Sequence, residues 1–258
     1  MTDLIIAPAL GLPIPTYDTP TDASATGVQD MPDTVPITTW NSGARHVKAE
    51  NTRADIQRII AKRPLMLGMQ EMGEKSAYNT AARLLKDAGY TMGHTSDSHT
   101  PIACIGKPVR RGSFFLTPRT YVGPAGAGPS TLKAKYIEWQ HIRYNSLNII
   151  HGNVHLAPSI YIPVRHQLHD RQVARIIEWA RAAKKDYDYV FLTGDFNALA
   201  SQMPKLNNIL QHNAPTPTHG RRAIDYVYGS VHPTGVTVID THSDHRALTA
   251  MATLKSKK

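Results

Sequence analysis

The chain has 258 residues, of which 41% are hydrophobic and 19% are charged. This length and composition suit one fairly large globular domain, or at most two small ones. The mean hydropathy is −0.33, and no apolar stretch reaches the roughly 20 residues that a membrane-spanning helix needs, so we expect no transmembrane segment. A single cysteine, Cys104, excludes an intramolecular disulfide framework and a cysteine-rich zinc module.

The apolar segment 4–14 does not have the features of a secretory signal. No Lys or Arg stands before it, Pro8 and Pro13 interrupt it, and Pro15 follows it directly. Because the single cysteine also means that the chain needs no oxidising compartment, we expect a cytoplasmic protein.

Charge divides the chain into two parts. Residues 1–36 hold five Asp and no Lys or Arg, are rich in Pro and Thr, and show no apolar period. This composition predicts a flexible or loosely docked acidic extension. Residues 37–258 carry the 29 basic and the other 15 acidic residues, a net charge of +14. A domain this basic is expected to attract polyanions, nucleic acid first and anionic lipid second.

From Ile37 onwards, short apolar runs alternate with amphipathic stretches, which is typical of an α/β or α+β domain. Pro64 and Gly89 mark the ends of two predicted helices. In the first half of the domain we expect strands at 37–40, 65–70 and 113–116 and helices at 53–62 and 76–88. The Gly/Pro-rich stretch 122–130 lacks a following Gly-Lys-Ser/Thr and is predicted to be a surface loop rather than a phosphate loop.

The second half continues the alternation and adds the longest predicted helix. We expect strands at 136–144, 147–156, 189–193, 224–228, 235–239 and 247–254, and helices at 165–184 and 204–210. No internal repeat of fixed period is present.

Acids, amides and histidines gather at the ends of these predicted strands. They are Asn41, Glu71, His155, Asp195, Asn197, Asp225, Asp244 and His245. In open α/β sheets, polar groups at strand ends converge into one crevice, where ligands bind. Each residue taken singly has an ordinary structural explanation, such as a turn cap or a core histidine. Together they favour a functional site.

Asp225 lies inside an apolar run that should be buried. A buried carboxylate without a partner costs several kcal/mol, so Asp225 requires one. Histidine is the usual partner, and His245 is close in sequence. We therefore predict an Asp225–His245 pair.

Six motifs, in order from Asn41 to His245, resemble the endonuclease/exonuclease/phosphatase superfamily. They are Thr39-Trp40-Asn41, Gln70-Glu71, Asn153-Val154-His155-Leu156, Gly194-Asp195-Phe196-Asn197-Ala198, Ile224-Asp225-Tyr226 and Ser243-Asp244-His245. The resemblance implies a two-sheet, four-layer α/β sandwich of the deoxyribonuclease I type. It also implies hydrolysis of a phosphate ester with a divalent metal, Mg²⁺ or Mn²⁺.

By the same resemblance, Glu71 would ligate Mg²⁺, with Asn41 beside it and Asp244 ligating directly or through water. Carboxylate, amide and water oxygens are the ligands that Mg²⁺ prefers. His245, oriented and made more basic by Asp225, would activate the attacking water.

The remaining roles concern the phosphate. Asp195 and Asn197 would position the nucleophile and the scissile phosphate, and Asp195 is also a candidate for the base or for protonating the leaving group. His155, as imidazolium, would stabilise the charge of the transition state.

Within the superfamily the +14 domain favours a nucleic-acid backbone, and we expect a DNA endonuclease that acts as a monomer. Arg110 and Arg111, expected in one loop, and Arg221 and Arg222, just before Asp225, are candidate phosphate contacts. Two alternatives stay open. One is a phosphatase or phosphodiesterase for a lipid or inositol head group, and the other is an inactive nucleic-acid-binding module.

Overall fold

The computed structural model describes residues 33–43, 48–121, 131–158 and 163–255, which belong to one structural unit, residues 31–258. The predicted loop 122–130 and the first 32 residues of the predicted extension lie outside the described residues. Within the described part of the chain, every helix is too short or too polar to cross a membrane.

The first sheet has the strand order β13-β14-β1-β2-β4-β3. Its strands, in chain order, are β1 (Thr34–Asn41), β2 (Met66–Gln70), β3 (Tyr90–Gly93), β4 (Ile102–Ile105), β13 (Thr234–Ile239) and β14 (Ala247–Thr253). The two central strands β1 and β2 are parallel, so both end at the same edge of the sheet, and the other neighbours are antiparallel.

The second sheet has the strand order β11-β12-β10-β9-β8-β5. Its strands are β5 (Arg110–Thr117), β8 (Lys135–Tyr144), β9 (Leu147–His155), β10 (Tyr189–Asp195), β11 (Gln211–His212) and β12 (Asp225–Gly229). Here β9 and β10 are the parallel pair. A separate two-stranded sheet is formed by β6 (Thr120–Tyr121) and β7 (Thr131–Leu132).

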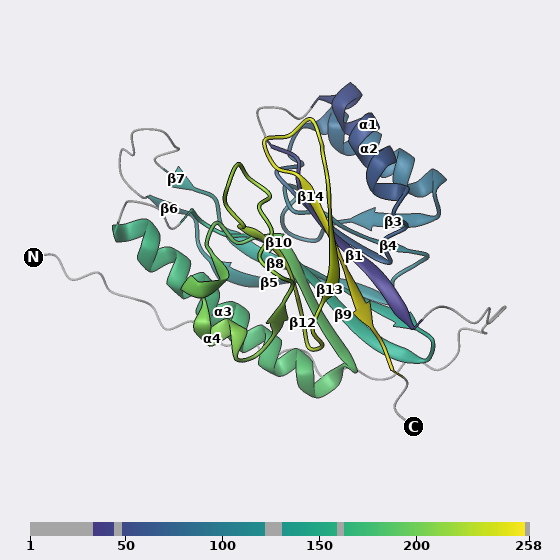
Figure 1. Cartoon of the computed structure of the whole chain (residues 1–258). Helices are drawn as coiled ribbons and strands as arrows, with labels where there is room; N and C mark the ends of the chain where they lie inside the picture. The colour runs from purple at the N-terminus through teal and green to yellow at the C-terminus, as the bar shows by residue number, and fades with distance from the viewer. Residues whose placement is uncertain (1–32, 44–47, 122–130, 159–162, 256–258) are drawn as a thin grey trace, which may run out of the picture. The chain divides into compact units, whose positions relative to one another are not determined.

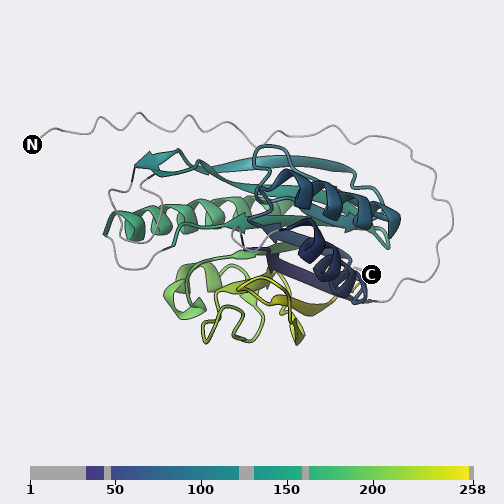
Figure 2. The same cartoon turned by 90° about the horizontal axis from the view of Figure 1, so that it is seen from above.

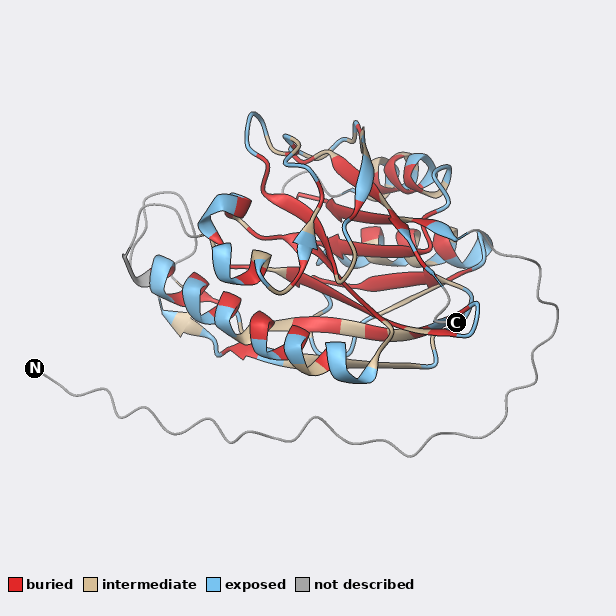
Figure 3. Cartoon of the chain, turned by 60° about the horizontal axis from the view of Figure 1, so that its bottom comes forward, coloured by how far each residue is buried: buried red, intermediate tan, exposed pale blue. Residues whose placement is uncertain are grey.

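Helices cover the outer face of each sheet, giving four layers (Figures 1 and 2). On the first sheet, α1 (Ala49–Ile60) and α2 (Lys75–Asp87) bury Ile56, Ile59 and Leu85. On the second, α3 (Pro163–Asp186) and α4 (Pro204–Asn207), with the short 3-10 helix η1 (Ala200–Gln202), bury Ile176, Trp179 and Leu206. Figure 3 shows α3 buried along the side that faces the sheet and exposed along the other.

The inner faces of the two sheets form a third core, which includes Ile37, Phe191 and Leu248. The sheets approach closely at Gly68, where a Cβ would lie 2.0 Å from the hydroxyl of Thr193. Glycine is therefore required at this position. This close contact between Gly68 and Thr193 helps to fix the distance between the two sheets at this point.

Most predicted elements are present with shifted ends. The helix predicted at 53–62 occupies Ala49–Ile60, and the strand predicted at 37–40 begins three residues earlier, at Thr34. The antiparallel pair β3 and β4 was not predicted, because each strand has only four residues and no clear alternation. The loop expected at Arg110 and Arg111 is wrong, since both residues lie in β5, paired with β8.

Candidate active site

The parallel strands of both sheets end at one place. In the first sheet, Asn41 is the last residue of β1 and Glu71 follows β2. In the second, Asp195 pairs with His155 on one side and with Asp225 on the other. The amide of Asn41 donates to Asp195 Oδ2 at 3.0 Å and to Glu71 Oε1 at 3.4 Å, so it joins the two sheets directly.

A buried amide network fixes these strand ends relative to one another. Gln70 Nε2 donates to Asn153 Oδ1 at 2.7 Å, and Asn153 Nδ2 donates to the carbonyl of Met69 at 2.7 Å. Both amide side chains are fully buried. Because buried polar groups that are satisfied only in one arrangement specify that arrangement, this network positions the neighbouring residues Glu71 and His155.

Glu71 adopts a left-handed backbone conformation, with φ of 59°. Such a conformation costs a non-glycine residue about 1–2 kcal/mol, and here it turns the chain sharply at the end of β2. The carboxylate lies 3.7 Å from Nε2 of His155, and the same Nε2 lies 3.8 Å from Asp195 Oδ2. His155 therefore lies between the carboxylates of the two sheets.

Asp225 and His245 form the hydrogen-bonded pair that the sequence predicted. Nδ1 of His245 lies 2.8 Å from Asp225 Oδ2, and the hydroxyl of Thr218 donates to the same oxygen at 2.5 Å. With Nδ1 held by Asp225, Nε2 faces the site and lies 3.9 Å from Asp195 Oδ2. Both partners are buried.

The protonation of the two histidines is driven in opposite directions. Burial lowers the pKa of His245, but the hydrogen bond and charge of Asp225, with Asp195 and Asp244, more than offset this and raise it to about 9. Burial lowers the pKa of His155 well below its usual value, and the charges of Lys135 and His245 lower it further. Burial and these positive charges oppose the imidazolium that we expected for His155.

Asp195 is the buried carboxylate at the centre of the site. Burial raises its pKa, and the charge of Asp225 raises it further. The backbone N–H of Asn197 donates to Asp195 Oδ1 at 2.8 Å, and Nδ2 of Asn197 donates to the carbonyl of Leu156 at 3.0 Å. Asn197, with φ of 51°, thus forms the turn that holds Asp195 in place.

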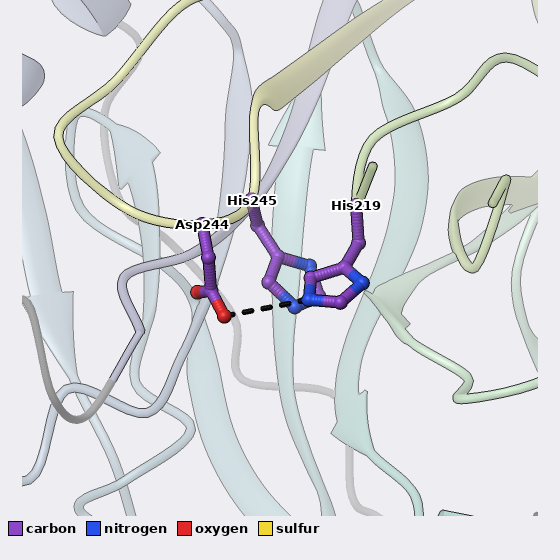
Figure 4. Close-up of side chains that lie close together, drawn as sticks. All are labelled: His219, Asp244 and His245. Carbon is purple, nitrogen blue, oxygen red and sulfur yellow. Dashed lines mark ion pairs between the residues drawn. The ribbon is translucent and has the colours of Figure 1, made fainter. Parts of the chain in front are cut away.

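Asp244 lies beside His219, a residue that the sequence reading did not single out. Its Oδ2 is 3.4 Å from Nε2 of His219 (Figure 4). The ring of His219 is 4.5 Å from the ring of His245, and a β-bridge joins the two residues. His219 reaches the site because the 218–222 turn folds back against His245. In the sequence, His219 lies in a polar loop with no motif around it, so nothing there predicted a place in the site.

The predicted arginines separate into two groups. Arg222 Nη2 lies 2.7 Å from Nδ1 of His219, and Arg221 is exposed beside it, so both are at the rim of the site. The structure does not bring Arg111 to the site. Arg111 pairs with Gln140 on β8, and Gln140 pairs with His151 on β9. His151 lies four residues, about 13 Å, before the site residue His155 at the end of β9. The guanidinium of Arg111 donates to the carbonyl of Thr91.

Lys135 is a second residue that the sequence reading missed. The carboxylates of Asp97, Asp195 and Glu71 all act on its charge, while burial lowers its pKa. A lysine at the start of a strand carries no sequence signal for such a role.

The donor atoms at the site fit a hard divalent cation. Glu71 and Asp195 bring carboxylate oxygens to one place, and Asp244 lies at the more exposed side. Asn41, expected beside the metal, turns its Nδ2–H group to both carboxylates, while its Oδ1 accepts from the N–H of Gly43 at 2.9 Å. The described site also holds excess negative charge. Oδ1 of Asp225 is buried without a hydrogen-bond partner, and the charge of Asp225 raises the pKa of Asp195. A cation bound among these carboxylates would offset that charge.

A two-sheet sandwich with such a site defines a class of phosphoester hydrolases. Residues 38–245 match the model of the endonuclease/exonuclease/phosphatase family, and the chain belongs to this family. No curated protein matches the sequence.

Solved structures confirm the deoxyribonuclease I-like sandwich. Truncated TDP2 from Caenorhabditis elegans is 14% identical, with a TM-score of 0.65, and the match covers 84% of this chain and 96% of that one. The human Nocturnin catalytic domain is 17% identical, with a TM-score of 0.61, covering 87% and 96%. A mannosyl-6-phosphatase from Bacteroides thetaiotaomicron is 15% identical, with a TM-score of 0.61, covering 84% and 99%.

Proposed function

We propose that the protein is a divalent-cation-dependent nuclease that cleaves the phosphodiester bonds of DNA. One observation carries this proposal. The hydrogen-bonded Asp225–His245 pair directs Nε2 toward Asp195, at the same place where Glu71 and His155 meet it from the other strands. A member of this family that only bound its ligand would have no need of an oriented base.

His245 acts as the general base in this proposal. Asp225 accepts a hydrogen bond from Nδ1–H and holds the ring, so that Nε2, once it has lost its own proton, can take a proton from an attacking water. The raised pKa makes His245 a strong base once its own proton has left. Glu71 and Asp244, with Asn41 beside Glu71, would hold Mg²⁺ or Mn²⁺, which offsets the charge of the phosphate when bound.

The other residues handle the phosphate and the leaving group. His155 places Nε2 between Glu71 and Asp195, where it can donate a hydrogen bond to a phosphate oxygen. Because burial favours a proton on Asp195, this carboxyl group is placed to protonate the leaving oxygen. Asn197 keeps Asp195 oriented through its backbone N–H.

Charge supports DNA as the substrate. Residues 37–258 carry a net charge of +14, and Arg221, Arg222 and Lys135 lie at or near the site. Contacts of basic side chains with phosphates bind a nucleic-acid backbone without regard to sequence and weaken as salt rises. We propose that the active form is a monomer.

The test is cleavage of supercoiled plasmid and of single-stranded DNA with Mg²⁺ or Mn²⁺, with and without EDTA. We expect nicking that EDTA abolishes and that His245→Ala and Asp195→Asn each nearly eliminate. The same preparations are offered an inositol phosphate, sphingomyelin and mannose 6-phosphate. Intact DNA together with turnover of one of these would replace the nuclease by a head-group or sugar phosphatase.

We also propose that the catalytic domain begins with β1 at Thr34, three residues before the boundary expected at 37, and that the acidic residues before it are dispensable for turnover. The truncation must spare β1, because Val35 and Ile37 are buried in the core between the sheets. Removal of residues 2–30 is expected to leave kcat unchanged in the plasmid assay. A large loss of kcat would show that the extension completes the site.

A further inference from the structure

The row of site residues continues across the second sheet into a pair of aromatic side chains. Asp225, Asp195 and His155 are neighbours on β12, β10 and β9. On the next strand Glu138 pairs with Asn153, two residues before His155, and Tyr136 lies two residues before Glu138, toward the same end of the sheet. Tyr136 in turn pairs with Phe115 on β5.

This end of the row is open to solvent. Phe115 is 45% exposed, and its ring packs edge-on against Tyr136 with centroids 5.6 Å apart. Tyr136 also lines a cleft of about 320 Å³ together with Asp97, His99 and Lys133. Nζ of Lys133 lies 2.7 Å from Nε2 of His99. We call Phe115, Tyr136, Lys133 and His99 the β8 surface.

The cleft is held rigidly beside the active site. The buried carboxylate of Glu138 accepts hydrogen bonds from the backbone N–H groups of Thr95, Ser96 and Asp97, at 2.5 to 2.8 Å. The same loop returns to the site, because the N–H of Met72, next to Glu71, donates to the carbonyl of His99. The loop is therefore braced from both sheets.

The chemistry of the β8 surface suits an unpaired nucleotide. Exposed aromatic rings provide faces on which bases stack, and basic side chains beside them follow the phosphate backbone. Lys133 is exposed and Lys135 lies nearer the site, so basic side chains continue from the site to the rings, beside the carboxylate of Asp97 in the same cleft. A base in a duplex is already stacked and paired, and it cannot offer its face to Phe115 or Tyr136.

We propose that the β8 surface binds the single-stranded nucleotides next to the scissile phosphodiester, and that the enzyme prefers unpaired DNA there. This inference rests on the proposed nuclease function. It adds the form of the substrate and the side chains that select it.

The experiment compares single-stranded and duplex oligonucleotides of the same sequence with bis(p-nitrophenyl) phosphate, a phosphodiester too small to reach the rings. The variants are Lys133→Ala, Phe115→Ala and Tyr136→Ala. The matched control is Lys62→Ala, an exposed lysine just after α1, which precedes β2 and so lies at the opposite end of the sheet from the site. Melting temperatures confirm that each variant is folded.

We expect each β8-surface variant to lower kcat/KM on the single-stranded oligonucleotide about tenfold or more relative to the small diester, through KM. The loss on duplex is expected to be smaller, and Lys62→Ala should behave as the wild type. If the small diester and the oligonucleotide are both cleaved and their ratio stays within twofold in all variants, the β8 surface is wrong and the nuclease proposal stands.

A second readout separates this inference from the nuclease proposal. Fluorescence anisotropy in EDTA measures binding of a labelled single-stranded oligonucleotide without turnover. We expect Lys133→Ala and Phe115→Ala to weaken it about tenfold and Lys62→Ala to leave it unchanged. If the wild type cleaves no substrate, the nuclease proposal fails, and this binding measurement alone tests whether the β8 surface binds single-stranded DNA. Equal binding by the wild type and all variants would show that it does not.

Discussion

Two aspartate–histidine pairs from the last 40 residues of the chain lie side by side, and they differ in how deeply they are buried. In the inner pair, Asp225 and His245 are 2.8 Å apart, with side chains 1% and 8% exposed. In the outer pair, Asp244 and His219 are 3.4 Å apart, with side chains 49% and 29% exposed. Because solvent screens exposed ion pairs, the outer pair is worth at most about 1 kcal/mol. The same residue types therefore orient a base only where water is excluded.

The largest expected effect comes from breaking the inner pair. Asp225→Asn replaces the carboxylate by an amide that cannot stabilise the protonated ring or hold its orientation. Loss of the orienting carboxylate from such a pair lowers kcat by roughly 10³–10⁴-fold. Steady-state kinetics on a DNA substrate would measure this, with circular dichroism to show that the variant is folded. A folded variant that loses less than tenfold would show that His245 needs no carboxylate.

The inner pair also predicts an unusual titration. The pKa of His245 is raised to about 9, above its unfolded value near 6.5. Its contribution to stability is therefore fully present below about pH 6.5 and is lost as pH rises through 9. Nuclear magnetic resonance of the metal-free protein should show the His245 ring titrating near pH 9, and lower in Asp225→Asn. A wild-type midpoint at or below 6.5 would contradict the coupling.

A third histidine sharpens the comparison, because it is buried without a carboxylate. His151 contacts only Gln140 and Thr193 through its ring nitrogens, among the hydrogen bonds of the described residues, and burial lowers its pKa to about 3. The unfolded chain binds a proton here between about pH 6.5 and 3 and the folded protein does not. Stability should therefore fall in this window as pH falls, by roughly 1.4 kcal/mol per pH unit.

Thermal melts at a series of pH values test this prediction. His151→Gln keeps polar atoms for Thr193 and Gln140 but does not titrate, so its melting temperature should depend less steeply on pH. Burial also lowers the pKa of His169, so part of the slope will remain. An unchanged slope in the variant would assign the acid sensitivity elsewhere.

The smallest effect is expected for the outer pair. His219→Gln removes the ion pair with Asp244 but leaves Asp225 and His245 untouched. We expect a change in kcat/KM of about threefold or less and a loss of stability under about 1 kcal/mol. Urea denaturation and the plasmid assay measure the two quantities. A hundredfold loss of activity would place His219 in the catalytic machinery.

Long apolar runs and motif residues were predictable, while short edge strands and loop contacts were not. The strand at 189–193 and the helix at 165–184 are strong local patterns, and both are present. The hydrogen bond between Asp225 and His245 was predicted from the cost of burying a lone carboxylate. The strand β4 depends on pairing with β2, and β3 on pairing with β4. The pKa of His155 is lowered first by burial and then by the charge of Lys135, which comes from another strand.

The sequence by itself determined the family, the alternation of strands and helices, and which polar residues follow which strands. These features are local, because periodicity and turn residues act over a few positions. Only the tertiary structure decided that Asp244 meets His219, that Arg111 lies away from the site, and that Lys135 and Tyr136 border it. Such pairings depend on strand register, on the close approach at Gly68 and on burial, and each of these is set by residues far apart in the chain.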